Sequence, residues 1–129
     1  VQLDNIARTV IANNVASAHI ALHWDSTNAD KGAFYMGVPE VDSYRSMEPV
    51  ASNWKKHEAL GKSLINGLSS NGTKIFSKGR MEMDLTQTSY STVPSIDIEL
   101  GDKTSDHGKD ELQKLSKGLA DGIDSYFGR

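Results

Sequence analysis

Two of the four histidines, His19 and His23, lie four residues apart in the apolar segment "AHIALHWDS". Imidazole serves either as a metal ligand or as a hydrogen-bonded core side chain. Residues 17–24 have the length and composition of a short buried strand, in which alternate side chains share a face. The two histidines would then lie about 13 Å apart along the strand, too far to bind one metal ion. We therefore expect His23, at the carboxyl end, to be functional and His19 to be a core or interface residue.

A second strand is predicted over residues 94–101, "PSIDIELG". Alternation separates its apolar from its polar side chains, with Ile96, Ile98 and Leu100 on one face and Ser95, Asp97 and Glu99 on the other. An unpaired carboxylate in a covered strand costs roughly several kcal/mol, so Glu99 is expected to be paired, bound to a metal or exposed. It lies at the carboxyl end of the strand, the edge where ligands bind in open α/β sheets. The alternative is an edge strand whose polar face meets water.

The remaining histidines and strand-end carboxylates indicate less specific roles. His57 lies in the middle of a predicted helix, where a structural role is expected, and His107 precedes the last helix, where a surface or capping role is expected. Asp25 and Asp102 directly follow the two candidate strands and either orient a ligand or close a turn. The sequence contains no phosphate loop, dinucleotide-binding fingerprint, Gly-x-Ser-x-Gly elbow or His-Glu-x-x-His helix.

The elements that position these side chains alternate between helices and strands. Hydrophobic periodicity and capping predict helices over 3–14 with Asp4 as N-cap, over about 51–68, and at the C-terminus after a cap at Ser105 or Asp106. Strands are predicted over 17–24, 32–38 and 93–100, with a possible short one over 83–86, and 39–50 and 69–80 are expected to be loops. This order predicts an α/β layered domain, an open and partly parallel sheet flanked by helices.

Composition narrows the classes of protein. A length of 129 residues, with 37% hydrophobic and 24% charged residues, indicates one soluble domain. A net charge of −3 argues against a general nucleic-acid binder. No segment has the pattern of a membrane span or a secretory signal. Because the chain has no cysteine, a metal site would have to use His, Asp or Glu.

The chain contains, in order, a helix ending in "IANN", then "HIALHWDS", "GAFYMG", "VPSIDIELGDKTSDHGKDELQKL" and a final helix with "LADGIDSYF". This ordered set resembles the zinc-dependent N-acetylmuramoyl-L-alanine amidases called amidase type 3. The family pattern Ser-Ile-His-x-Asn falls on residues 21–25, and Pro-Ala-Val-x-Val-Glu-Leu-Gly-Phe falls on 94–102. The resemblance implies that His23 is a zinc ligand and Glu99 the catalytic carboxylate. The chain departs from the pattern at Asp25, at Asp97, where the family has an apolar residue, and at Asp102.

The resemblance further implies a function and an incomplete site. Zinc would hold a water and polarise the amide between N-acetylmuramic acid and L-alanine of peptidoglycan. Glu99 would transfer the proton of that water to the leaving amine. The loops 39–50 and 69–80 would form the walls of the groove that binds the glycan and the stem peptide. The family's first strand and following helix, which carry two further zinc ligands, have no counterpart here. Residues 1–129 therefore correspond to the later part of the catalytic domain, with a segment expected before Val1, and this chain alone is expected to bind zinc poorly.

Three hypotheses about function follow from these observations. The first is an enzyme acting outside the cell on peptidoglycan glycan strands and stem peptides, as an autolysin, a spore enzyme or a phage endolysin. The second is a truncated or degenerate amidase-like module that binds peptidoglycan or a protein partner without hydrolysing it. The third is an unrelated α/β domain.

Overall fold

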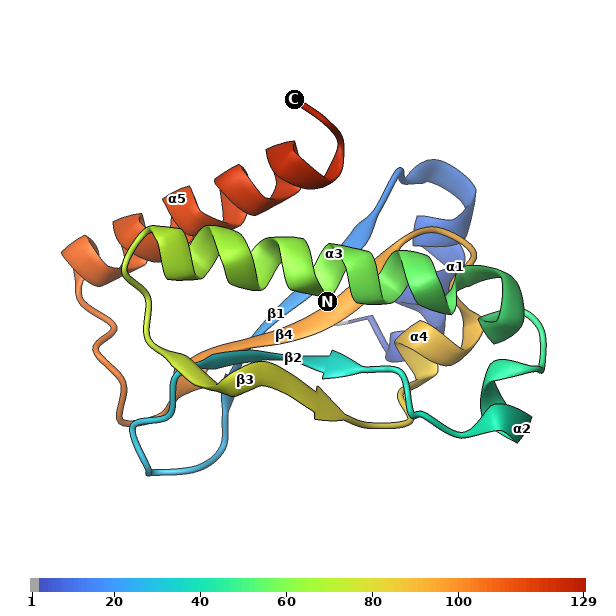
Figure 1. Cartoon of the computed structure of the whole chain (residues 1–129), viewed down its shortest axis with the longest axis horizontal. Helices are drawn as coiled ribbons and strands as arrows, with labels where there is room; N and C mark the ends of the chain where they lie inside the picture. Colours follow the sequence, from blue (N-terminus) through green and yellow to red (C-terminus); the bar gives the residue numbers. More distant parts are fainter. Residues whose placement is uncertain (1–2) are drawn as a thin grey trace.

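The computed structural model describes residues 3–129 and shows a four-stranded mixed sheet between two layers of helices (Figure 1). The elements, in chain order, are α1 (Asn5–Val15), β1 (His19–Asp25), β2 (Ala33–Gly37), α2 (Asp42–Arg45), α3 (Val50–Ser70), β3 (Ile75–Glu82), α4 (Thr86–Tyr90), β4 (Ser95–Asp102) and α5 (Lys109–Tyr126). The predicted α/β class with an open, partly parallel sheet is confirmed. None of the helices in the described chain is long and apolar enough to cross a bilayer.

The strand order is β1-β4-β2-β3. β1 is parallel to β4, β2 is antiparallel to β4, and β3 is parallel to β2. The carboxyl ends of β1 and β4 therefore lie at the same edge of the sheet, together with the amino end of β2. This topology brings the end of β4 next to the end of β1 and the start of β2, although β4 lies far from both in the sequence.

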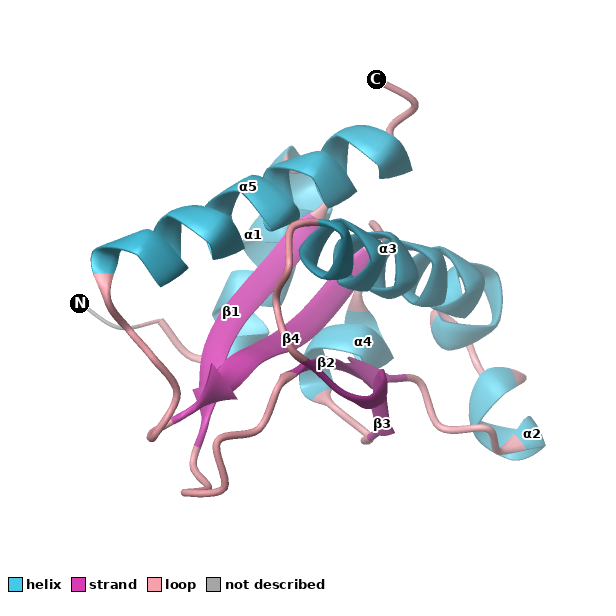
Figure 2. Cartoon of the chain, turned by 60° about the vertical axis from the view of Figure 1, so that its left-hand side comes forward, coloured by secondary structure: helices cyan, strands magenta, loops and turns pink. Residues whose placement is uncertain are grey.

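Each face of the sheet has its own helical layer (Figure 2). On one face, apolar side chains of β2 and β4 form the core with α3 and α5, namely Tyr35, Ile96, Ile98, Leu60, Leu64, Leu68 and Leu115. The other face carries the polar residues of β4, and there Gln87 of α4 donates a hydrogen bond to Ser95 Oγ over 2.9 Å. α1 packs against α4 in the same layer. The predicted alternation along β4 is thus confirmed.

The first and the last helix test the predicted helix caps, with opposite results. Asp4 is the N-cap of α1 as predicted, because its Oδ1 accepts a hydrogen bond from Ala7 N at 2.7 Å. The predicted cap of the last helix is wrong. α5 begins at Lys109 after Gly108, and Asp106 instead accepts a hydrogen bond from the N–H of that glycine.

Two predicted segments between the main elements are also wrong, and a third is correct only in part. Half of the expected loop 69–80 belongs to β3. This strand is irregular, with positive φ at Ser77 and Gly79, and so lacks the regular alternation that marks a strand. The expected strand over 83–86 is irregular chain leading into α4. The expected loop 39–50 contains the single-turn helix α2.

β1 differs from the predicted buried strand because it lies at an edge of the described sheet. Leu22 and Trp24 remain exposed on it. The neighbouring helix α1 likewise exposes most of its apolar side chains, among them Ile6, Val10 and Val15, which is 80% exposed. Both β1 and α1 thus carry apolar side chains that the described chain leaves exposed.

Candidate functional site

The register of β1 and β4 places the two sequence-predicted site residues side by side. His23 pairs with Glu99, Ala21 with Asp97, and His19 with Ser95. Side chains at paired positions of parallel strands point to the same face of a sheet. His23 and Glu99 therefore lie next to each other in the carboxyl-terminal halves of their strands, on the face opposite the core. The edge-strand alternative for Glu99 is wrong, because β4 has a neighbour on both sides.

Asp97 joins this pair through a direct contact. Its Oδ2 lies 3.1 Å from His23 Nε2, with the Asp97 side chain 17% exposed and the His23 side chain 43% exposed. Strand alternation predicts Asp97 on the same face as Glu99 but does not predict a role for it. A role for Asp97 could have been suspected from the sequence, because it carries a charge at a position where amidase type 3 proteins have an apolar residue.

Glu99 is buried between its strand neighbours. Its other cross-strand partner is Phe34 of β2, which is almost fully buried, and Glu99 itself is only 9% exposed. Burial, reinforced by the neighbouring charge of Asp97, raises the pKa of Glu99. Burial also raises the pKa of Asp97, although His23 partly opposes the increase. A carboxylate in such a position is a stronger proton acceptor than one in water.

Two oxygen atoms of this cluster are buried without a hydrogen-bond partner. They are Asp97 Oδ1 and Glu99 Oε2. Leaving a buried carboxylate oxygen unpartnered costs free energy, so such atoms are expected where a ligand supplies the missing partner. An imidazole with two carboxylates is a donor set that suits zinc, and the cluster therefore fits part of a zinc site. Within residues 3–129, however, no three His, Cys, Asp or Glu side chains are arranged to hold a metal ion.

His19 lies on the same face but apart from this cluster. It is paired with Ser95, two positions before Asp97, and its Nδ1 is buried without a partner. Burial lowers the pKa of His19, and the charge of Arg8 on α1 lowers it further. His19 and His23 thus have different surroundings, and their different roles stay a prediction.

The strand-end aspartates close turns, which was one of the two predicted roles. Asp102 is fully buried, and its Oδ2 accepts hydrogen bonds from Thr27 Oγ1 and from the N–H groups of Ala29 and Lys31, at 2.8 to 3.2 Å. Burial alone would raise the pKa of Asp102, but these hydrogen bonds hold it well below its usual range. Asp25 pairs with Lys31 at 3.0 Å. The loop after β1 is thereby tied to the end of β4.

His57 supports the site from the core side. It is fully buried on α3, and its Nδ1 accepts a hydrogen bond from Ser95 N at 2.9 Å. Burial lowers the pKa of His57 to about 4, so the ring is neutral at physiological pH. The predicted structural role takes a specific form, because His57 anchors the first residue of the strand that carries Asp97 and Glu99.

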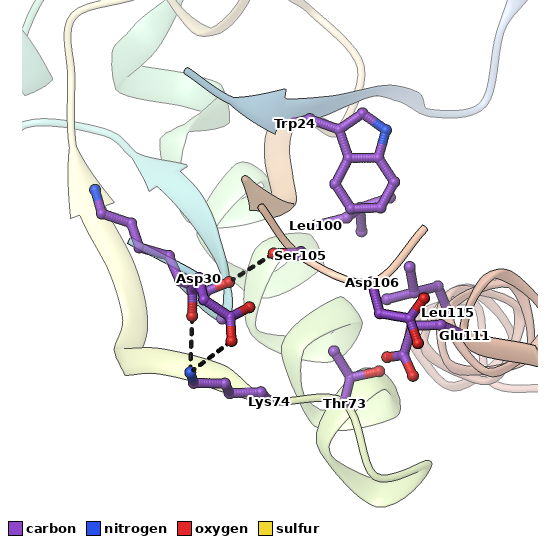
Figure 3. A pocket seen from close by; sticks show the side chains of 11 residues that line it. Trp24, Asp30, Thr73, Lys74, Leu100, Ser105, Asp106, Glu111 and Leu115 are labelled. Carbon is purple, nitrogen blue, oxygen red and sulfur yellow. Dashed lines mark hydrogen bonds and ion pairs between the residues drawn. The ribbon is translucent and has the colours of Figure 1, made fainter. Parts of the chain in front are cut away.

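The surroundings of the cluster differ from the predicted groove. β2 runs antiparallel to β4, so the segment 39–50 leaves the sheet at the end opposite Glu99. A cavity of about 170 Å³ does lie near this edge, but on the core face of the sheet (Figure 3). Trp24, Leu100, Asp106 and Glu111 contribute to its lining. His107, expected at the surface, stacks on Trp24 with ring centroids 3.9 Å apart.

Comparison with known proteins identifies the fold. No family model matches the chain, and no curated protein matches its sequence. Solved structures do match. The apo form of the N-acetylmuramyl-L-alanine amidase Ami1 from Mycobacterium abscessus is similar with a TM-score of 0.74 at 18% identity, over 95% of this chain and 61% of that one. The N-acetylmuramoyl-L-alanine amidase AmiC2 of Nostoc punctiforme gives 0.70 at 21% identity, over 100% of this chain and 67% of that one.

The catalytic domain of CwlV, an N-acetylmuramoyl-L-alanine amidase from Bacillus (Paenibacillus) polymyxa, gives a TM-score of 0.65 at 16% identity, over 99% of this chain and 68% of that one. At such identities the comparison shows a shared fold. The chain spans about three fifths of the length of the mycobacterial Ami1 structures.

Proposed function

We propose that this chain is part of a peptidoglycan hydrolase that cleaves the amide bond between N-acetylmuramic acid and L-alanine of the stem peptide. The observation that carries the proposal is the pairing of His23 with Glu99 in the carboxyl-terminal halves of β1 and β4. This pairing occurs in a fold similar to that of N-acetylmuramoyl-L-alanine amidases. The substrate would be the glycan strand with its stem peptide, and the place of action the cell wall, for an autolysin or an endolysin.

In this proposal His23 is a zinc ligand and Glu99 is the general base. A zinc ion held there would supply a Lewis acid for the carbonyl and lower the pKa of water. Glu99 would accept a proton from the attacking water and deliver it to the leaving amine of L-alanine. Its burial beside Phe34 and its unpartnered Oε2 support this role, because a partly desolvated carboxylate holds a transferred proton more readily than an exposed one.

We further propose that residues 1–129 are one part of the catalytic domain. The apolar side chains that remain exposed at the surface of α1 and β1, among them Val15 and Leu22, support this proposal, because exposed apolar side chains in such numbers are usually covered by another part of a domain or by a partner. The length of the mycobacterial Ami1 structures also agrees with it. The missing metal ligands would then come from the polypeptide that covers this surface.

One observation favours a second function, a non-catalytic module that binds peptidoglycan or a protein partner. Residues 3–129 hold no group of three metal-ligating side chains, and a catalytic zinc site needs three protein ligands and an open position. If no other polypeptide supplies the missing ligands, the chain would bind its substrate without hydrolysing it.

The test compares variants of the complete gene product on purified peptidoglycan, with release of stem peptides as the readout. Glu99→Gln should lower kcat by about 10²–10⁴-fold while zinc content stays unchanged. His23→Ala should lose both zinc and activity. The matched control is Glu48→Gln, because Glu48 is exposed in the segment at the opposite end of the sheet.

Two results would contradict the enzyme proposal. Full activity of Glu99→Gln would remove Glu99 from the chemistry. Wild-type protein that sediments with peptidoglycan but releases no peptide would establish the non-catalytic function instead.

A further inference from the structure

We propose that Asp97 is a direct metal ligand beside His23, so that this chain contributes two ligands to the metal site rather than one. The inference rests on the proposed function insofar as a metal ion belongs at His23. It goes beyond that function because neither the sequence pattern nor the resemblance gives Asp97 any role.

The distance between the two side chains carries the proposal. His23 Nε2 and Asp97 Oδ2 lie 3.1 Å apart. Two ligand atoms bound tetrahedrally to one zinc ion, each at about 2.0–2.1 Å, are separated by about 3.3–3.4 Å. The 3.1 Å contact is itself that of a direct hydrogen bond, and it is close enough to the spacing around a shared ion for both side chains to bind one. Only a few tenths of an ångström of side-chain movement would be needed.

The strand register explains why the two side chains meet. Asp97 is paired with Ala21, whose methyl group leaves space between the two strands on this face. His23 lies two residues further along β1, on the same face. Both ligands would thus stand on adjacent hydrogen-bonded strands, which hold side chains more rigidly than loops do.

A second observation at the same place points to a cation. Glu99, one of the most deeply buried carboxylates of the chain, leaves its Oε2 without a partner on this face, and Asp97 Oδ1 is likewise buried and unpartnered. Arg8 of α1 and Lys31 are the cations whose charges reach this cluster, and Lys31 is already paired with Asp25. His23 and Asp97 thus supply a nitrogen and an oxygen donor of the kinds that bind zinc, and the Glu99 carboxylate beside them adds a negative charge that attracts a cation.

The competing role for Asp97 is to orient His23. In that arrangement His23 Nε2–H donates a hydrogen bond to Asp97, and the metal binds Nδ1 on the other side of the ring. The two roles differ in which ring nitrogen binds the metal. They also differ in the effect of Asp97→Asn, because an amide oxygen still accepts the hydrogen bond but is a much weaker zinc ligand than a carboxylate.

The experiment titrates the chain with zinc alone, using calorimetry for affinity and long-range ¹H–¹⁵N spectra of the histidine rings to identify the nitrogen that binds. We expect saturable binding, a shift of Nε2 of His23, and no shift of His19. Asp97→Asn and Asp97→Ala should each weaken zinc binding by at least about tenfold, or about 1.4 kcal/mol. The control Asp124→Asn removes the same charge from an exposed position on α5 and should bind like the wild type.

Three outcomes would overturn the proposal: binding through Nδ1 of His23, wild-type affinity in Asp97→Asn, or no saturable binding by the wild-type chain at millimolar zinc. The proposed function fails independently. Wild-type protein that shows the expected zinc spectra but cleaves no peptidoglycan refutes the hydrolase and leaves Asp97 as a ligand. If His23 binds zinc through Nδ1 and the protein still cleaves peptidoglycan, the Asp97 proposal is refuted and the hydrolase proposal stands.

Discussion

Acidification from neutral pH to about pH 4 tests whether His57 is held as a neutral hydrogen-bond acceptor at the start of β4. The ring is fully buried, and Nδ1 accepts from Ser95 N. Burial lowers the pKa of His57 from 6.5 to about 4. In the unfolded chain the same histidine takes up its proton near pH 6.5. Unfolding between these two values is therefore accompanied by proton uptake.

The sign and size of the effect follow from linkage. Because the folded-state pKa is the lower one, the contribution of His57 is fully present above pH 6.5 and is lost as the pH falls towards the folded pKa. One pKa unit corresponds to about 1.4 kcal/mol, so the difference between 6.5 and about 4 is worth about 3 kcal/mol. The free energy of unfolding should decrease by at most about 1.4 kcal/mol per pH unit from this group. Asp97 and Glu99, whose pKa values are raised, act in the opposite direction.

The assay is denaturant unfolding at a series of pH values for the wild type and for His57→Gln. The difference between their free energies of unfolding isolates His57 from the other titrating groups. It should be constant above pH 7 and shrink by about 3 kcal/mol towards pH 4. An NMR titration of the His57 ring provides the same information if the variant does not fold. Parallel pH curves for the two proteins, or a ring that protonates near pH 6.5, would refute the reasoning.

Three further perturbations address the scaffold. Arg80→Met leaves the buried Glu58 carboxylate without the guanidinium that now binds both its oxygens at 2.9 and 3.0 Å, and should lower the free energy of unfolding by about 3–5 kcal/mol in urea denaturation; a loss below about 1 kcal/mol contradicts this. Gly67→Ala places a methyl group against the Gly118 carbonyl and within 2.7 Å of Gly122 N, which should lower the free energy of unfolding by about 1–3 kcal/mol. The control Ser69→Ala, on the exposed side of α3, should leave it unchanged. Asp102→Asn should loosen the loop 26–32, seen as faster proteolysis there and a lower Tm; an unchanged cleavage rate would show that the loop is held by other contacts.

Much of the candidate site could be predicted from the sequence because it depends on local rules. Alternation along a strand placed Asp97 and Glu99 on one face of β4, and rise per residue separated His19 from His23. The expectation that His23 and Glu99 lie at strand ends holds only approximately, because β1 continues to Asp25 and β4 to Asp102. The sequence pattern does not predict the register between β1 and β4. That register makes His23 the neighbour of Glu99.

The errors occur where local signals are weak. β3 has two residues with positive φ and no regular alternation, so it was predicted as a loop. β1 is as apolar as a buried strand, but its burial depends on what pairs with its free edge, and that is not a property of the segment itself. The Glu58–Arg80 pair joins residues from α3 and β3, and no spacing rule connects them.

The sequence by itself determined the α/β class, the capped first helix, the amphipathic last helix and the two faces of β4, because hydrophobic period and capping act over a few residues. Only the tertiary structure decided that Asp97 contacts His23, that Asp102 ties down the loop after β1, and that His57 anchors Ser95. Each of these contacts joins different elements, and its geometry depends on strand order and helix packing. The residue types therefore determine what chemistry the cluster can do. The pairing of β1 with β4 determines which residues belong to the cluster.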